Sequence, residues 1–132
     1  MSDLRALVES GLIDKEDGTI FDNSTGLLWQ QSSSDKIFTW KGAKKYCKSL
    51  TLAGHDDWRL PTIEELEILI NKKYKPTIDP IFKGESGIYW SSSAPVDNPS
   101  LPWIVGFCYG SMYFDNKGSR YFVRAVRGKS NV

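Results

Sequence analysis

The sequence is poor in the side chains that most often carry catalysis or hold metal ions. Among 132 residues it has one histidine, His55, and two cysteines, Cys47 and Cys108. A Ser-His-Asp or Cys-His catalytic group would have to use His55, which lies in a polar stretch, residues 54–57, typical of an exposed loop. One imidazole and two distant thiols do not supply a structural zinc site, and two cysteines are too few for a disulfide framework. We therefore expect no metal and no cofactor.

The sequence also lacks a long apolar run and an excess of charge of one sign. No apolar run approaches the roughly 20 residues that cross a bilayer, so we expect no transmembrane segment. The N-terminus lacks the pattern of a signal peptide, which predicts a cytoplasmic protein, or an extracellular or periplasmic one if a signal has been removed. Lys and Arg number 17 against 16 Asp and Glu. Because nucleic-acid-binding proteins depend on concentrated basic residues, this balance argues against a nucleic-acid partner.

Other catalytic patterns are equally weak. Asp56 with Asp57, and Glu64 with Glu65, are paired carboxylates, but sequence neighbours point in different directions and seldom act as a glycosidase pair. Residues 115–119 lack the oxygen spacing and the closing glutamate of a calcium loop, and are expected to form a hairpin turn. No glycine-rich phosphate-binding motif is present. The sequence therefore predicts a protein that is not an enzyme.

The length of the chain indicates one folded domain with a short N-terminal appendage. We expect residues 1–17 to form this appendage, a short helix capped by Asp3 and ended by Gly11 and then a linker, and residues 18–132 to form the domain. Residues 19–21 and 27–29 predict a β-hairpin in which Gly26 takes a positive φ.

Two helices are predicted in the first half of the domain. From Thr39 as N-cap, apolar side chains recur at three- and four-residue steps as far as Leu50. Thr62 and Glu65 have the spacing of a capping box and start a second helix with a buried stripe. Its apolar stripe is Ile63, Leu66, Leu69 and Ile70. Proline at positions 76 and 80 then predicts a surface loop.

From residue 88 onward the apolar period changes from 3.6 to 2. Strands are predicted at residues 88–92, 103–109, 112–114 and 121–127, joined as an antiparallel meander. Helices first and strands afterwards predict an α+β fold in which two helices pack on a twisted antiparallel sheet. Trp29 and Trp90, in predicted strands, are expected to be core aromatics.

Four motifs carry a resemblance to a known family. They lie at residues 25–30, 57–66, 89–93 and 123–128, and include Asp57-Trp58-Arg59-Leu60-Pro61. In this order they resemble the bacterial Lcl C-terminal domain family, named for a collagen-like adhesin. The helix start at residues 59–62 is also similar to that of formylglycine-generating-enzyme-like domains. Both resemblances imply a C-type lectin-like fold, in which Trp58 anchors a loop and Arg59 satisfies buried carbonyls or a carboxylate.

The sequence departs from these families at functionally important positions. The first family often has a cysteine where Ala125 stands here, which would bridge to Cys47. We therefore expect Cys47 to be a buried free thiol unless Cys108 takes the place of that partner. The pair of active-site cysteines of the formylglycine-generating relatives is missing. The Glu-Pro-Asn and Gln-Pro-Asp triplets of calcium-dependent lectins are also missing. Calcium-mediated sugar binding is therefore not expected of this chain.

The sequence favours a recognition domain that binds an extracellular or surface ligand, a glycan or a protein, as in adhesins. Aromatic residues make up 13% of the chain, and rigid aromatics among small polar residues are typical of adaptable binding sites. The predicted ligand-binding residues are Trp103, Tyr109, Tyr113, Asn116, Arg120 and Tyr121. A second candidate is a basic helix face that could bind sulfated glycans, formed by Lys41, Lys44, Lys45 and Lys48.

Two other functions stay open at this point. One is an enzyme on a formylglycine-generating-enzyme-like scaffold with unidentified catalytic residues, because a fold alone does not decide function. The other is a variable ligand-display protein of phage or retroelement type, which would concentrate substitutions in residues 94–121. The sequence names neither the ligand nor the oligomeric state.

Overall fold

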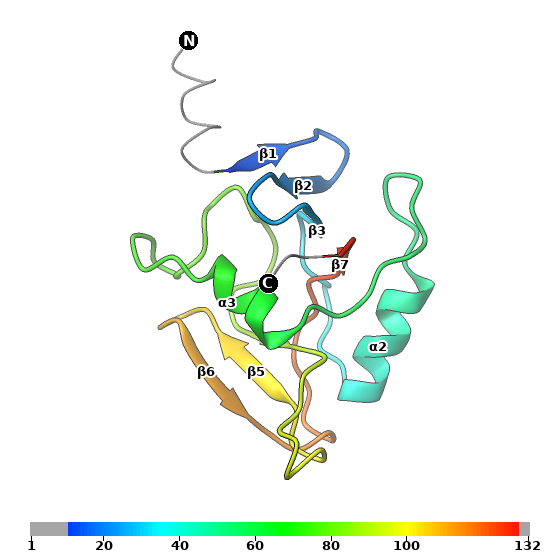
Figure 1. Ribbon diagram of the computed structural model, residues 1–132, viewed down its shortest axis with the longest axis vertical. Coiled ribbons are helices and arrows are strands. Elements are labelled where there is room, and N and C mark those ends of the chain that lie inside the picture. Colours follow the sequence, from blue (N-terminus) through cyan, green and yellow to red (C-terminus); the bar gives the residue numbers. More distant parts are fainter. Residues whose placement is uncertain (1–10, 130–132) are drawn as a thin grey trace.

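The computed structural model describes residues 11–129, which form an α+β fold of two helices and two antiparallel sheets (Figure 1). The helices are α2 (Trp40–Ser49) and α3 (Ile63–Leu69). One sheet has the strand order β1-β2-β3-β7 and the other β4-β5-β6. The predicted appendage helix falls mostly on residues 1–10, outside the described residues. Within the described residues, neither helix has the length and apolar character to cross a membrane.

The predicted N-terminal hairpin is confirmed. Its strands are β2 (Thr19–Asp22) and β3 (Leu27–Gln30), and Gly26 in the turn has a φ of 80°. Strand β1 (Leu12–Asp14) adds to β2 as a third antiparallel strand, although the sequence pattern placed these residues in a linker. Three residues are too few to display an alternating pattern, so this strand depends on its pairing with β2.

Both predicted helices are confirmed, together with their caps. The Thr39 side chain accepts a hydrogen bond from the Gly42 N–H at the start of α2, which buries Ala43 and Cys47. Thr62 and Glu65 form both hydrogen bonds of the capping box at the start of α3. Each helix therefore begins where a local side chain satisfies free backbone N–H groups.

The predicted four-stranded meander is wrong in its last strand. β4 (Ile88–Trp90), β5 (Trp103–Gly106) and β6 (Ser111–Phe114) pair antiparallel as expected. The C-terminal segment, residues 121–127, does not follow β6 as a fourth antiparallel strand. Phe122 forms an isolated parallel bridge with Tyr89 of β4, and β7 (Val126–Arg127) pairs with β3. A period of 2 identifies a strand without identifying its partner. The predicted α+β fold class is therefore confirmed, while the last strand pairs with the N-terminal hairpin.

The C-terminal segment runs from β4 of one sheet to β3 of the other. Its buried apolar side chains belong to two hydrophobic clusters, Val126 to one and Val123 and Ala125 to the other. Tyr89 and Val105 belong to one cluster, while their neighbours Trp90 and Ile104 belong to the other. Alternation along β4 and β5 therefore sends side chains into both clusters. Trp29 and Trp90 are fully buried, which confirms them as core aromatics.

Two arginines, Arg124 and Arg59, form hydrogen bonds that connect these elements. Arg124 is buried and donates to the carbonyls of Gln30, Gln31 and Lys83, which joins β3 and the loop before β4 to the C-terminal segment. Burial holds the pKa of its guanidinium below the ordinary value. Arg59 pairs with Glu65 through two hydrogen bonds of 2.8 Å each and also donates to the Gly128 carbonyl. The expectation that Arg59 satisfies buried carbonyls or a carboxylate is therefore confirmed for the carboxylate.

Candidate functional site

Helix α2 presents four lysines to solvent on the side opposite its buried face. These exposed residues are Lys41, Lys44, Lys45 and Lys48. Within residues 11–129, the two ion pairs are Arg59–Glu65 and Arg127–Asp57, so no lysine of α2 is paired. The helix has no acidic residue in its first turn. Like charges four residues apart, as in Lys41–Lys45 and Lys44–Lys48, destabilise a helix by roughly 0.2–0.5 kcal/mol per pair. The helix thus carries concentrated positive charge at some cost to its stability.

A fifth lysine joins this face through Trp40. The Lys44 Nζ lies 3.3 Å from the Trp40 ring centroid, and the Lys117 Nζ, from the turn after β6, lies 5.0 Å from it. The Trp40 indole is fixed by donating to the Ser91 carbonyl at 2.8 Å, and its backbone N–H donates to the Lys117 carbonyl at 3.1 Å. Burial, and then repulsion from Lys117, hold the pKa of Lys44 below its usual range. Two cations therefore share one aromatic ring.

A cavity of about 480 Å³ lies beside this lysine face. Its lining residues are Lys44, Cys47, Lys48, Trp58, Arg59, Leu60, Thr62 and Ser92. Trp58 and Leu60 are buried and supply an apolar surface, while no lining residue carries a carboxylate. Because Arg59 is bound to Glu65, Lys44 and Lys48 are the lining cations that have no ion-pair partner among the described residues. An apolar surface flanked by cations suits an anionic ligand that contains a ring.

The predicted aromatic residues do not form one exposed face. Tyr121 packs its ring edge-to-face on buried Trp90, with centroids 5.0 Å apart, and its hydroxyl donates to Asp115. Burial, and then Asp115, raise the pKa of Tyr121 to about 12. Trp103 is half-buried and packs edge-to-face on Phe114. The Asn116 side chain accepts hydrogen bonds from the Gly118 and Ser119 N–H groups and so holds its own turn together.

The other predicted residues, Tyr109, Tyr113 and Arg120, are exposed. Sequence reasoning missed two neighbours on β6, Met112 and Phe114, which are also exposed. It also missed Lys117, since nothing local indicates that the turn after β6 contacts α2. The run Met112-Tyr113-Phe114 has no apolar–polar alternation. Because successive side chains of a strand point to opposite faces, this run already indicated apolar groups on both faces of the sheet. The assignment of the aromatic residues to a ligand stays a prediction.

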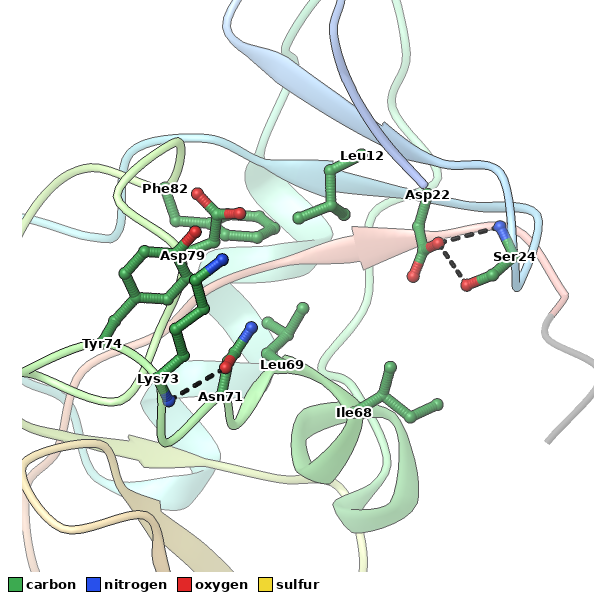
Figure 2. A pocket seen from close by; sticks show the side chains of 10 residues that line it. All are labelled: Leu12, Asp22, Ser24, Ile68, Leu69, Asn71, Lys73, Tyr74, Asp79 and Phe82. Atoms are coloured by element: carbon green, nitrogen blue, oxygen red, sulfur yellow. Dashed lines mark hydrogen bonds between the residues drawn. The ribbon is translucent and has the colours of Figure 1, made fainter. Parts of the chain in front are cut away.

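A second cavity, of about 410 Å³, lies between the β1–β2–β3 sheet and the segment after α3. Figure 2 shows Asp22 and Ser24 at one side and Tyr74, Asp79 and Lys73 at the other. The Asp22 carboxylate accepts from the Ser24 N–H and hydroxyl at 2.9 and 2.6 Å. Asp79 likewise accepts from a backbone N–H of its own loop, at 2.9 Å. Both carboxylates thus stabilise turns rather than forming a pair.

The remaining reactive side chains lie apart. Cys47 is buried and Cys108 is exposed, and neither forms a disulfide, so Cys108 does not replace the missing partner. His55 is half-buried, with its ring edge-on to Trp58 at 6.5 Å. In the part of the chain that the structure describes, no three His, Cys, Asp or Glu side chains gather as metal ligands would.

The comparisons with known proteins bear on residues 18–127. Over this range the sequence matches the model of the Lcl C-terminal domain family. A search of curated proteins found no match. The matched residues contain both helices and all strands except β1.

Proposed function

The chain belongs to the Lcl C-terminal domain family, and we propose that it is a non-enzymatic recognition domain that binds an anionic ligand on the lysine face of α2. We name this area the basic surface, consisting of Trp40, Lys41, Lys44, Lys45, Lys48 and Lys117. The observation that carries the proposal is that, among residues 11–129, none of its four helix lysines forms an ion pair, while Lys44 and Lys117 share the Trp40 ring.

The spacing of the lysines favours a ligand with repeated anionic groups. Lys41 and Lys48 are seven residues apart, which is about 10 Å along a helix axis at 1.5 Å per residue. One isolated anion would contact only part of this length. The sulfate or carboxylate groups of consecutive sugars in an acidic glycan would contact several lysines at once, and a sugar ring would fit the apolar surface of Trp58 and Leu60. We therefore propose an acidic glycan as the ligand, in an adhesin-like role, on a variant of the C-type lectin-like fold.

Charge reversal tests this proposal. The double variant Lys44→Glu, Lys48→Glu should bind a sulfated polysaccharide such as dextran sulfate at least tenfold more weakly than the wild type. The matched control is Lys72→Glu, Lys75→Glu, which changes net charge equally in the exposed loop after α3. Affinity of the wild type should also fall as salt rises from about 50 to 500 mM, because exposed charges are screened. Equal losses in both double variants would mean that only net charge matters, and would contradict a site on α2.

The predicted aromatic face is tested separately. If Tyr109 and Arg120 contact the ligand, Tyr109→Ala and Arg120→Ala should each lower affinity by about tenfold while the unfolding midpoint stays unchanged. Tyr121→Ala is expected to lower stability instead, because its ring packs on Trp90. Unchanged affinity in the first two variants would restrict the ligand to the basic surface.

A further inference from the structure

The outer strand of the three-stranded sheet has a free edge. Among the described residues β6 pairs with β5 alone, and all four of its residues are exposed. Figure 1 shows β6 at the margin of the molecule, outside β5. Free edges in natural proteins usually carry a charged residue or a proline, which prevents pairing with another chain. Ser111–Phe114 contains neither, so this edge is open to another strand.

The backbone register determines which groups face the free edge. The Asp115 N–H donates to the Pro102 carbonyl at 3.2 Å, and Ile104 lies opposite Tyr113. In an antiparallel pair, hydrogen-bonded positions alternate with positions whose N–H and C=O point outward. Tyr113 therefore bonds to β5, whereas the N–H and C=O groups of Met112 and Phe114 point away from it.

The edge is complementary to itself. When two copies of β6 run antiparallel with their Tyr113 residues at the centre, Met112 of each copy lies opposite Phe114 of the other. The outward N–H and C=O groups of these two residues then form four hydrogen bonds. Met112 and Phe114 lie on one face of the sheet, the face of Trp103 and Val105, so each Met side chain meets a Phe side chain. The strand has no charge, so like charges do not oppose the pairing.

We propose that β6 pairs with β6 of a second copy of this chain and forms a symmetric dimer with a continuous six-stranded sheet. Met112, Tyr113 and Phe114 are 41%, 40% and 49% exposed. At roughly 200 Å² for each side chain, this corresponds to about 250 Å² per copy, well below the roughly 800 Å² per partner of a standard interface. The dimer is therefore weak and forms only at high protein concentration. Such an association matters where chains are held close together, since a high local concentration favours it.

Sedimentation equilibrium of the full chain from about 10 µM to 2 mM tests the proposal. The weight-average mass should rise from 14.9 kDa towards twice that value. The variant Met112→Lys, Phe114→Lys should remain monomeric throughout, because four positive charges would meet at the edge. The matched control is Ile37→Lys, Ile68→Lys, since these side chains are 45% and 41% exposed outside β6. It should dimerise like the wild type.

Hydrogen exchange of the wild-type protein gives a readout that does not depend on any variant folding. At 2 mM the amides of Met112 and Phe114 should exchange at least twofold more slowly than at 10 µM, while the amide of Tyr113 is unaffected. A mass of 14.9 kDa at every concentration, or a dimer that persists in the β6 variant, would overturn the proposal. So would protection that leaves Met112 and Phe114 unchanged. The basic surface is not on β6, so failure of this proposal leaves the glycan-binding test unaffected.

Discussion

Replacing Arg59 with Met should destabilise the domain more than replacing Glu65 with Gln or Thr62 with Ala at the start of α3. The Glu65 side chain is 2% exposed, and its carboxylate accepts two hydrogen bonds from Arg59 and one from the Thr62 N–H. Without Arg59, this buried negative charge loses two charge-assisted hydrogen bonds. Removing one partner of a buried ion pair costs about 3–5 kcal/mol. Because Arg59 is 38% exposed and solvent already screens the pair, we expect the lower end, about 3 kcal/mol.

The converse substitution should cost less. Glu65→Gln leaves the positive charge on Arg59, which is reached by water and still donates to the Leu60 and Gly128 carbonyls. We expect a loss of about 2 kcal/mol. Thr62→Ala removes one cap hydrogen bond, and should cost about 1 kcal/mol.

Urea unfolding followed by circular dichroism measures all three variants. The expected order of destabilisation is Arg59→Met, then Glu65→Gln, then Thr62→Ala, with unchanged dependence on urea concentration. An Arg59→Met protein as stable as the Thr62→Ala protein would refute the reasoning, because the carboxylate would then be hydrated without Arg59. A double variant Arg59→Met, Glu65→Leu that recovers stability would support it, since the buried charge itself is then absent.

The remaining predictions concern a buried cation and the two thiols. Arg124→Met should cost about 3 kcal/mol in urea unfolding because three carbonyls each lose one hydrogen bond from the buried guanidinium, whereas exposed Arg120→Met should change stability by less than about 0.5 kcal/mol. In the folded protein a thiol reagent should modify Cys108 and leave Cys47 unmodified, as counted by mass spectrometry. Burial raises the pKa of Cys47 from 9.0 to about 12, so its contribution to stability is complete below pH 9 and lost as pH rises towards 12. Unfolding of the wild type and Cys47→Ala at pH 8 and 11 checks this, and an equal drop in both would contradict it.

The sequence by itself determined the elements whose cause is local. The capping box at Thr62, the N-cap at Thr39 and the turn containing Gly26 depend on residues within four positions of one another, so their chemistry can be read directly from the chain. The fold class followed from the order of these elements. The family was also recognisable, because its motifs are contiguous stretches of residues.

Tertiary structure alone decided the partners of the strands and the make-up of the surfaces. β7 joins β3 rather than the meander, because strand pairing depends on which edge is free in three dimensions. Lys117 reaches Trp40 from a distant turn, so the basic surface extends beyond the helix where the four lysines were recognised. The free edge of β6 likewise depends on its outer position in the sheet, which the strand pairing decides. A periodic pattern reports which way side chains alternate, but burial depends on what packs against each face.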